Sequence, residues 1–208
     1  MTFLIQLNIH GYNILTIFWN IFLALLPCLT VYYLAKSVGK KKFKQFKIIE
    51  IVAFILIFLF WFFFFPNTAY LFADIRHLVD YCTDWDAYRV CKEETWMVFF
   101  FFTYALAGVP TLYYALKKMS VLLGNVFFDK LRIIFPLIMI PLTSIGVMFG
   151  LWERFNSWNI INQPLSLFKT GFSYFTDATL FFNFFILTIC MYIIYYGVGI
   201  FINYLKNN

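Results

Sequence analysis

The sequence predicts an all-α fold, a polytopic membrane helix bundle that forms a single transmembrane domain over residues 1–208. Of the 208 residues, 63% are apolar, 12% are charged and 30 are Phe, whereas an ordinary soluble domain is about 45–50% apolar and about 25% charged. A soluble chain of this size could not bury so many apolar side chains, because too much of its surface would remain in water. The composition therefore excludes a soluble enzyme and a disordered protein.

Five stretches are long and apolar enough to cross the hydrocarbon core, which takes roughly 20 residues. None contains an Asp, Glu, Lys, Arg or His in its interior. That absence argues against an ion-coupled mechanism, because buried ionisable residues usually mark ion and proton paths. The five predicted spans are Tyr12–Ala35, Ile48–Pro66, Thr95–Leu116, Leu131–Gly150 and Ala178–Leu205.

Two further segments are expected to lie along the membrane surface. Residues 1–10 are too few to span, and no basic n-region precedes the first apolar stretch, so we do not expect a cleaved signal peptide. Residues 160–176 are too polar to span, and Pro164 and Gly171 would bend them. We therefore predict an interfacial segment before the last helix.

The basic residues predict the orientation. Most of the lysines lie in the loops after the first and third spans, and Lys206 follows the fifth span. Basic loops stay on the cytoplasmic side, so we expect a multi-pass protein with its N-terminus outside and its C-terminus inside the plasma membrane. The net charge of +6 is thus a signal of topology and of attraction to anionic lipid headgroups. It gives no reason to expect nucleic acid as a partner.

The first informative outer segment is Pro66–Leu78. Pro66 begins a turn, and the residues after it are periodic enough for a short helix near the interface. Asp74 and His77 are three residues apart, so they share a face of that helix. A carboxylate beside an imidazole fixes its tautomer and raises its basicity, which suits a general base. Two alternatives remain open: a solvated surface pair that caps the helix, and a metal site completed by Glu93, Glu94 or Glu153.

The second informative segment is Gly150–Asn159. Arg154 follows the fourth span directly and has Trp152 and Trp158 on either side. One interpretation is an aromatic belt with an arginine reaching the interface. The other is a grip for a phosphate or carboxylate, because a planar guanidinium packed by indoles binds an anionic head well.

These segments, together with Asn20–Pro27, resemble an uncharacterised bacterial integral membrane family catalogued as domain of unknown function 1361. The resemblance covers nearly the whole chain. Its most specific positions are Pro66, Asn67, Tyr70, Asp74, His77, Leu78, Arg154, Asn156, Ser157 and Trp158. It implies the topology and the positions of the motifs but no activity, and it favours a functional role for the residues on which it concentrates.

The chain also departs from the family pattern at three positions. Ala69 stands where a second proline is usual, Leu151 where an arginine is usual, and Asn159 where an aspartate is usual. The last two departures weaken the case for a multi-residue ionic site after the fourth span.

Other polar residues lead to narrower expectations. Asn20 and Asn183 lie within predicted spans and are expected to hydrogen-bond across helices, with a role in lining a substrate path as the alternative. Cys28 and Cys190 should pack as small apolar residues. A disulfide between Cys82 and Cys91 and two free thiols are both open for the outer loop.

Three functions follow from this pattern, and we favour an enzyme acting at the outer interface on a lipid-linked or lipid-anchored substrate. Asp74 would orient His77 as the general base, and Arg154 would hold a phosphate or oxyanion. The further candidates for substrate binding are Asn67, Tyr70, Asn156 and Trp158. The alternatives are a non-catalytic subunit or scaffold that binds a membrane-protein partner, and a small lipid transporter. The sequence assigns no metal and identifies no cofactor.

Overall fold

The computed structural model describes residues 8–9, 12–39, 41–76, 95–153, 155 and 162–208. In this part of the chain, five helices are long and apolar enough to cross a membrane. This confirms the predicted all-α multi-span fold. The five spans are Leu15–Val38, Ile48–Ala73, Val98–Val126, Leu131–Leu151 and Ala178–Asn207.

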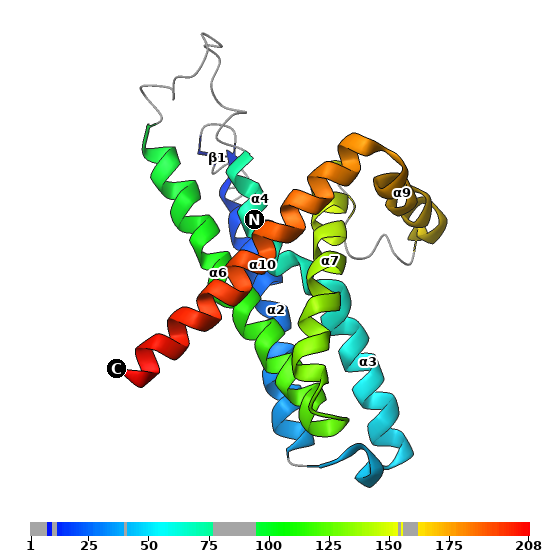
Figure 1. Ribbon diagram of the computed structural model, residues 1–208. Helices are drawn as coiled ribbons and strands as arrows, with labels where there is room; N and C mark the ends of the chain where they lie inside the picture. Colours follow the sequence, from blue (N-terminus) through cyan, green and yellow to red (C-terminus); the bar gives the residue numbers. More distant parts are fainter. Residues whose placement is uncertain (1–7, 10–11, 40, 77–94, 154, 156–161) are drawn as a thin grey trace.

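The described elements follow one another in the order shown in Figure 1. An antiparallel pair of strands, each two residues long, precedes the first helix and pairs Asn8 with Asn13. The elements are β1 (Asn8–Ile9), β2 (Tyr12–Asn13), α2 (Ile14–Val38), η1 (Phe43–Gln45), α3 (Ile48–Phe64), α4 (Pro66–Ala73), η2 (Asp74–Arg76), α6 (Thr95–Val126), α7 (Leu131–Leu151), α9 (Pro164–Thr176) and α10 (Ala178–Asn207).

The second span continues beyond the proline at which the sequence predicted its end. Helix α3 stops at Phe64, and α4 starts at Pro66 after a single joint residue. Proline fits the first position of a helix, because its missing N–H would have no partner there. The side chains of Asn67 and Thr68 donate to the carbonyls of the preceding turn, 2.9 Å and 2.8 Å away. The joint is therefore a bend between two helices, and the predicted short helix after it is confirmed.

Helix α4 lies at the centre of the bundle, where it packs against α2, α6 and α7. Three glycines on the neighbouring helices make room for it. A Cβ on Gly108 of α6 would come within 3.1 Å of the Thr68 carbonyl oxygen. On α7, a Cβ on Gly146 would come within 2.7 Å of the Pro66 ring and one on Gly150 within 2.6 Å of the Tyr70 ring. Small residues let membrane helices approach closely, so these glycines seat α4 inside the bundle instead of at its surface.

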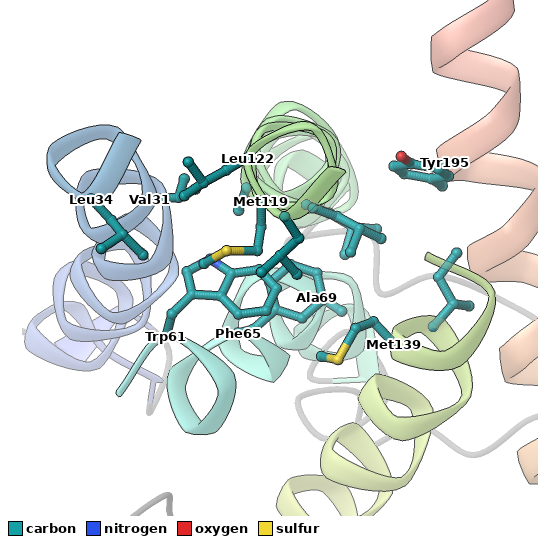
Figure 2. Packing of buried hydrophobic residues seen from close by; sticks show 14 of the residues in the cluster. Val31, Leu34, Trp61, Phe65, Ala69, Met119, Leu122, Met139 and Tyr195 are labelled. Carbon is teal, nitrogen blue, oxygen red and sulfur yellow. The ribbon is translucent and has the colours of Figure 1, made fainter. Parts of the chain in front are cut away.

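Below α4, an aromatic core joins the helices (Figure 2). Trp61 is fully buried and stacks on Phe65 with 4.6 Å between ring centroids. Val31 and Leu34 of α2 and Met119 of α6 belong to the same cluster. This core fixes the α3–α4 joint, and therefore the direction in which α4 leaves it.

Helix α9 is too short to span, in agreement with the predicted interfacial segment. Its 13 residues bury Leu167 and Tyr174 and leave Phe168 and Phe172 exposed. Helix α10 then begins at Ala178, directly after its N-cap residue Asp177, crosses the bundle obliquely and contacts α6, α7 and α9. Its 30 residues are more than the hydrocarbon core requires, so we expect it to tilt in the membrane or to extend beyond it at one end.

The loops that carry most of the lysines lie at one end of the bundle, where α2 and α6 end and α3 and α7 begin (Figure 1). We call this end, residues 36–47 and 127–132, the lysine-rich end. Gly39 terminates α2 there with a φ of 58°, a left-handed conformation that glycine adopts without strain. The membrane side on which this end lies stays a prediction.

Candidate functional site

The described polar centre of the protein is the side chain of Asp74, at the junction of α4 and η2. Its exposed fraction is only 1%. Its Oδ2 atom accepts a hydrogen bond from the Nδ2 of Asn20, 2.9 Å away, and another from the hydroxyl of Tyr104, 3.0 Å away. These three residues, which we call the Asp74 cluster, connect the end of α4 to α2 and α6.

The position of the cluster follows from the way α4 packs between its neighbouring helices. Eight helical residues carry the chain from Pro66 to Ala73, so Asp74 emerges between α2 and α6, two of the three helices that pack against α4. Asn20 lies five residues inside the span Leu15–Val38, a depth of about 7.5 Å along a helix. That span is about 36 Å long, against a hydrocarbon core of about 30 Å. Centred on a core of that thickness, the span would put Asn20 a few ångströms inside the boundary between acyl chains and headgroups, and this depth stays a prediction.

This burial overturns one interpretation of Asp74. The alternative in which Asp74 is a solvated surface carboxylate at a helix end is wrong, because its side chain is almost completely enclosed. The spacing of Asp74 in the sequence places it on a helix face but does not say what covers that face. The three glycines on α6 and α7 allow neighbouring helices to cover it.

The two described donors to Asp74, Asn20 and Tyr104, are neutral, and they come from helices other than its own. A hydrogen bond that an ionised carboxylate accepts is roughly twice as strong as one between neutral groups. An isolated buried carboxylate would lose its hydration without compensation. The arrangement therefore holds Asp74 in one position and restores part of the hydrogen bonding that it loses on burial.

Two other candidates, Asn67 and Tyr70, lie on α4 in line with Asp74. Four residues separate Tyr70 from Asp74 and seven separate Asn67 from Asp74, spacings that place all three on one side of the helix. The Tyr70 hydroxyl donates to the Gly150 carbonyl oxygen at 3.4 Å, and Asn67 caps the preceding turn. The structure thus places Asn67 and Tyr70 on α4 and Asp74 directly after it, and it gives the first two packing contacts.

Several predicted residues lie outside the described part of the chain. They are His77, Arg154, Asn156, Trp158, Glu93, Glu94, Cys82 and Cys91. Within the described part there is no group of three or more His, Cys, Asp and Glu side chains arranged to hold a metal ion.

A second polar group lies between α7 and α9, and sequence reasoning missed it. Tyr174 is 1% exposed, and its ring contacts Phe149 and Trp152, with centroids 5.4 Å and 6.0 Å away. Its hydroxyl has no hydrogen-bond partner among the residues that the structure describes. Burial raises the pKa of Tyr174 to about 12, and the nearby charge of Glu153 adds to the effect.

Sequence reasoning also missed Tyr104 as a partner of Asp74. A tyrosine in an apolar span needs a partner for its hydroxyl, so a signal was present. The chain holds 14 tyrosines, however, and the sequence does not distinguish this one. For Asn20 the predicted hydrogen bond across helices is confirmed.

Comparison with known proteins supplies a family. The model of a family described as "Protein of unknown function (DUF1361)" matches residues 19–194. The matched range contains the whole Asp74 cluster and α9. No curated protein and no solved structure matches the chain.

Proposed function

Because the chain belongs to the DUF1361 family of proteins of unknown function, we propose its activity from the Asp74 cluster rather than from a relative. The proposal is an enzyme that acts at the outer membrane interface on a lipid-linked or lipid-anchored substrate. Asp74 acts as a positioning residue, and His77, three residues further on, acts as the general base.

The observation that carries this proposal is the immobilised carboxylate. Hydrogen bonds from α2 and α6 fix Asp74 Oδ2, and both donors belong to membrane-spanning helices instead of loops. Catalytic groups work best when a rigid surrounding shell holds them. A purely structural carboxylate at this place is the costlier solution, since an apolar side chain would fill the same space without a desolvation penalty.

In the proposed mechanism each residue has one task. His77 takes a proton from a water or hydroxyl nucleophile as that oxygen attacks the phosphorus or carbonyl carbon of the substrate, and the imidazolium returns the proton to the leaving oxygen as the bond between that oxygen and the same atom breaks. Asp74 keeps the imidazole in the orientation in which it accepts that proton and stabilises the imidazolium that results. Arg154 neutralises the phosphate or oxyanion on which negative charge develops, while Asn156 and Trp158 contact the substrate head.

The depth of the cluster supports the class of substrate. Asn20 and Tyr104 lie five and six residues inside their spans, Leu15–Val38 and Val98–Val126. This is the level at which the head of a lipid meets its acyl chains. A lipid-anchored molecule brings its reactive group to this depth without leaving the membrane, whereas a water-soluble substrate would have to enter it.

Asp74 also supports a second function, a small lipid transporter. The sequence argued against coupling to protons because no ionisable residue falls inside a predicted span. The carboxylate is nevertheless enclosed between α2 and α6, and buried acidic residues are typical of proton relays.

Replacement of the three proposed residues tests the enzyme. We expect His77→Gln, Asp74→Asn and Arg154→Lys each to abolish complementation of a deletion strain and to cause the same lipid-linked precursor to accumulate. Asp129→Asn is the matched control, because Asp129 is an exposed carboxylate at the lysine-rich end. Lipid and lipoprotein profiles unchanged by His77→Gln, with normal protein levels, contradict the proposal.

Reconstitution separates the enzyme from the transporter. Purified protein in liposomes that carry a labelled lipid should not move the label between leaflets if the protein is an enzyme. Movement that persists in His77→Gln and stops in Asp74→Asn favours transport. Purification together with a stoichiometric membrane protein would instead favour the third alternative, a scaffold.

A further inference from the structure

A cavity of about 400 Å³ opens at the lysine-rich end, far from the Asp74 cluster along the bundle. Phe43 and Phe46 contribute to it from the segment before α3, Ile51, Ile55 and Phe58 from α3, and Phe127 from the end of α6. Every lining residue is apolar. The volume lies within the roughly 300–1,000 Å³ typical of ligand pockets.

The shape of the cavity follows the membrane normal. Ile51 and Phe58 lie three and ten residues after the start of α3 at Ile48, depths of about 4.5 Å and 15 Å along the helix. The second value is half of a hydrocarbon core about 30 Å thick. The cavity thus begins near the headgroups and reaches to about the middle of the bilayer, which is the path of one acyl chain.

Aromatic side chains form the walls of the cavity, and α3 and α6 do not pack directly against each other there. The ring of Phe127 lies 4.9 Å from that of Phe43 and 6.2 Å from that of Phe54, centroid to centroid. These rings connect α3 to the end of α6 and leave the space between the two helices unfilled. A flexible hydrocarbon chain suits such a space, because the lining offers no polar group to orient a polar ligand.

Exposed lysines are close neighbours in sequence of the aromatic residues that line the cavity. Lys42, Lys44 and Lys47 alternate with Phe43 and Phe46 in the sequence, and all three lysines are exposed. The nearby acidic residues are already engaged, because Glu50 pairs with Lys41 at 2.6 Å and Asp129 with Arg132 at 3.3 Å. Among the described residues, the side chains of the three lysines form no ion pair, although the backbone N–H of Lys47 donates to Glu50 at 3.0 Å. Their ammonium groups are therefore available for an anion.

We propose that this cavity binds one anionic phospholipid, with an acyl chain between α3 and α6 and its phosphate on Lys42, Lys44 and Lys47. The apolar lining selects hydrocarbon, and the charge at the mouth selects an anionic head over a zwitterionic one. The site is independent of the proposed enzymatic activity, since it shares no residue with the Asp74 cluster.

Native mass spectrometry of the full-length protein, extracted from nanodiscs of phosphatidylcholine and phosphatidylglycerol, tests this. We expect wild-type protein to retain phosphatidylglycerol in preference to phosphatidylcholine. The triple variant Lys42→Gln/Lys44→Gln/Lys47→Gln should lose that preference by about fivefold for each lysine neutralised. Lys206→Gln is the matched control and should behave as wild type, and the three lysines replaced by arginine should keep the preference.

A second pair of variants tests the cavity itself. Ile55→Trp places an indole in the space and should reduce the retention of phosphatidylglycerol, whereas Ile193→Trp on the exposed face of α10 should not. Equal retention of the two lipids by wild type, an unchanged preference in the triple lysine variant, or full retention in Ile55→Trp overturns the proposal. Retention of a co-purified peptide in place of lipid overturns it as well.

Discussion

The ring of Tyr70 lies directly against the backbone of Gly150. The Tyr70 hydroxyl donates to the Gly150 carbonyl oxygen at 3.4 Å, and a Cβ at Gly150 would come within 2.6 Å of Cε2 of Tyr70. One turn earlier, Pro66 packs on Gly146 in the same way. Two residues four apart on α4 thus fit two glycines four apart on α7, which sets the position of Asp74 at the end of α4.

We therefore predict that Gly150→Ala and Gly146→Ala destabilise the protein by about 1–3 kcal/mol, the usual cost of an added group in a packed contact. Thermal unfolding of the purified protein in detergent measures this. Gly197→Ala is the control, because a Cβ there meets nothing within 4 Å. Tyr70→Ala should rescue Gly150→Ala and leave Gly146→Ala unchanged. If both glycine variants unfold at the wild-type temperature, the close packing of α4 on α7 is wrong.

Tyr174→Phe should stabilise the protein. The hydroxyl of Tyr174 is buried and makes no hydrogen bond with the described part of the chain, and an unsatisfied buried polar group costs about 1–3 kcal/mol. Phenylalanine keeps the ring contacts with Phe149 and Trp152 and removes the hydroxyl. Tyr204→Phe, at an exposed position near the end of α10, is the control and should leave the unfolding temperature unchanged. A lower unfolding temperature for Tyr174→Phe would mean that the hydroxyl has a stabilising partner.

The same tyrosine predicts a pH dependence. Its pKa rises from 10.0 to about 12 on folding, because burial disfavours the phenolate. The unfolded chain therefore releases this proton at a lower pH than the folded chain does. The free energy of unfolding of the wild type is therefore unaffected by this group below pH 10 and decreases as the pH rises from 10 toward about 12. Unfolding temperatures of wild type and Tyr174→Phe should diverge over that interval, and a constant difference between them would contradict the assignment.

Asp177 should contribute to the junction of α9 and α10. Its Oδ1 accepts hydrogen bonds from the backbone N–H groups of Thr179 and Leu180, at 2.8 Å and 2.9 Å. Replacing an N-cap aspartate with alanine costs about 0.5–2 kcal/mol. We expect Asp177→Ala to increase hydrogen exchange in the first turn of α10, and Asp129→Ala to leave that turn unchanged. Equal exchange in both variants would show that the cap is dispensable.

The sequence predicted the spans because their signal is local. Apolar runs of about 20 residues need no knowledge of their neighbours, and each of the five predicted runs corresponds to a membrane-length helix. The short helix after Pro66 was predictable for the same reason. What local patterns do not contain is the face against which that helix packs, so Asp74 was open to a surface interpretation and is in fact buried.

One signal for that burial was present in the sequence. Gly146 and Gly150 have the spacing at which small residues let membrane helices pack closely, but the sequence does not reveal that α4 is the partner. The two asparagines show the same limit. Asn20 makes its predicted bond across helices, whereas Asn183 is exposed on α10 and makes none among the described residues. Residue type predicts the need for a partner, and only the fold supplies one.

The last prediction concerns the Asp74 cluster. We expect the contributions of Asn20 and Tyr104 to the free energy of unfolding to be coupled, although the two residues lie on different helices. Removing one donor with Tyr104→Phe or Asn20→Ala should cost about 1.5–3 kcal/mol each, because the acceptor is a carboxylate. This exceeds the roughly 0.6 kcal/mol average for hydrogen bonds between membrane helices.

The double variant should deviate from additivity, since both donors serve Oδ2 and the second loss leaves that atom without either of them. Unfolding free energies of the four proteins, with Tyr33→Phe on the exposed side of α2 as control, measure the coupling. Additive losses would mean that Asn20 and Tyr104 stabilise the bundle independently of Asp74, and the immobilised carboxylate would no longer support a catalytic role.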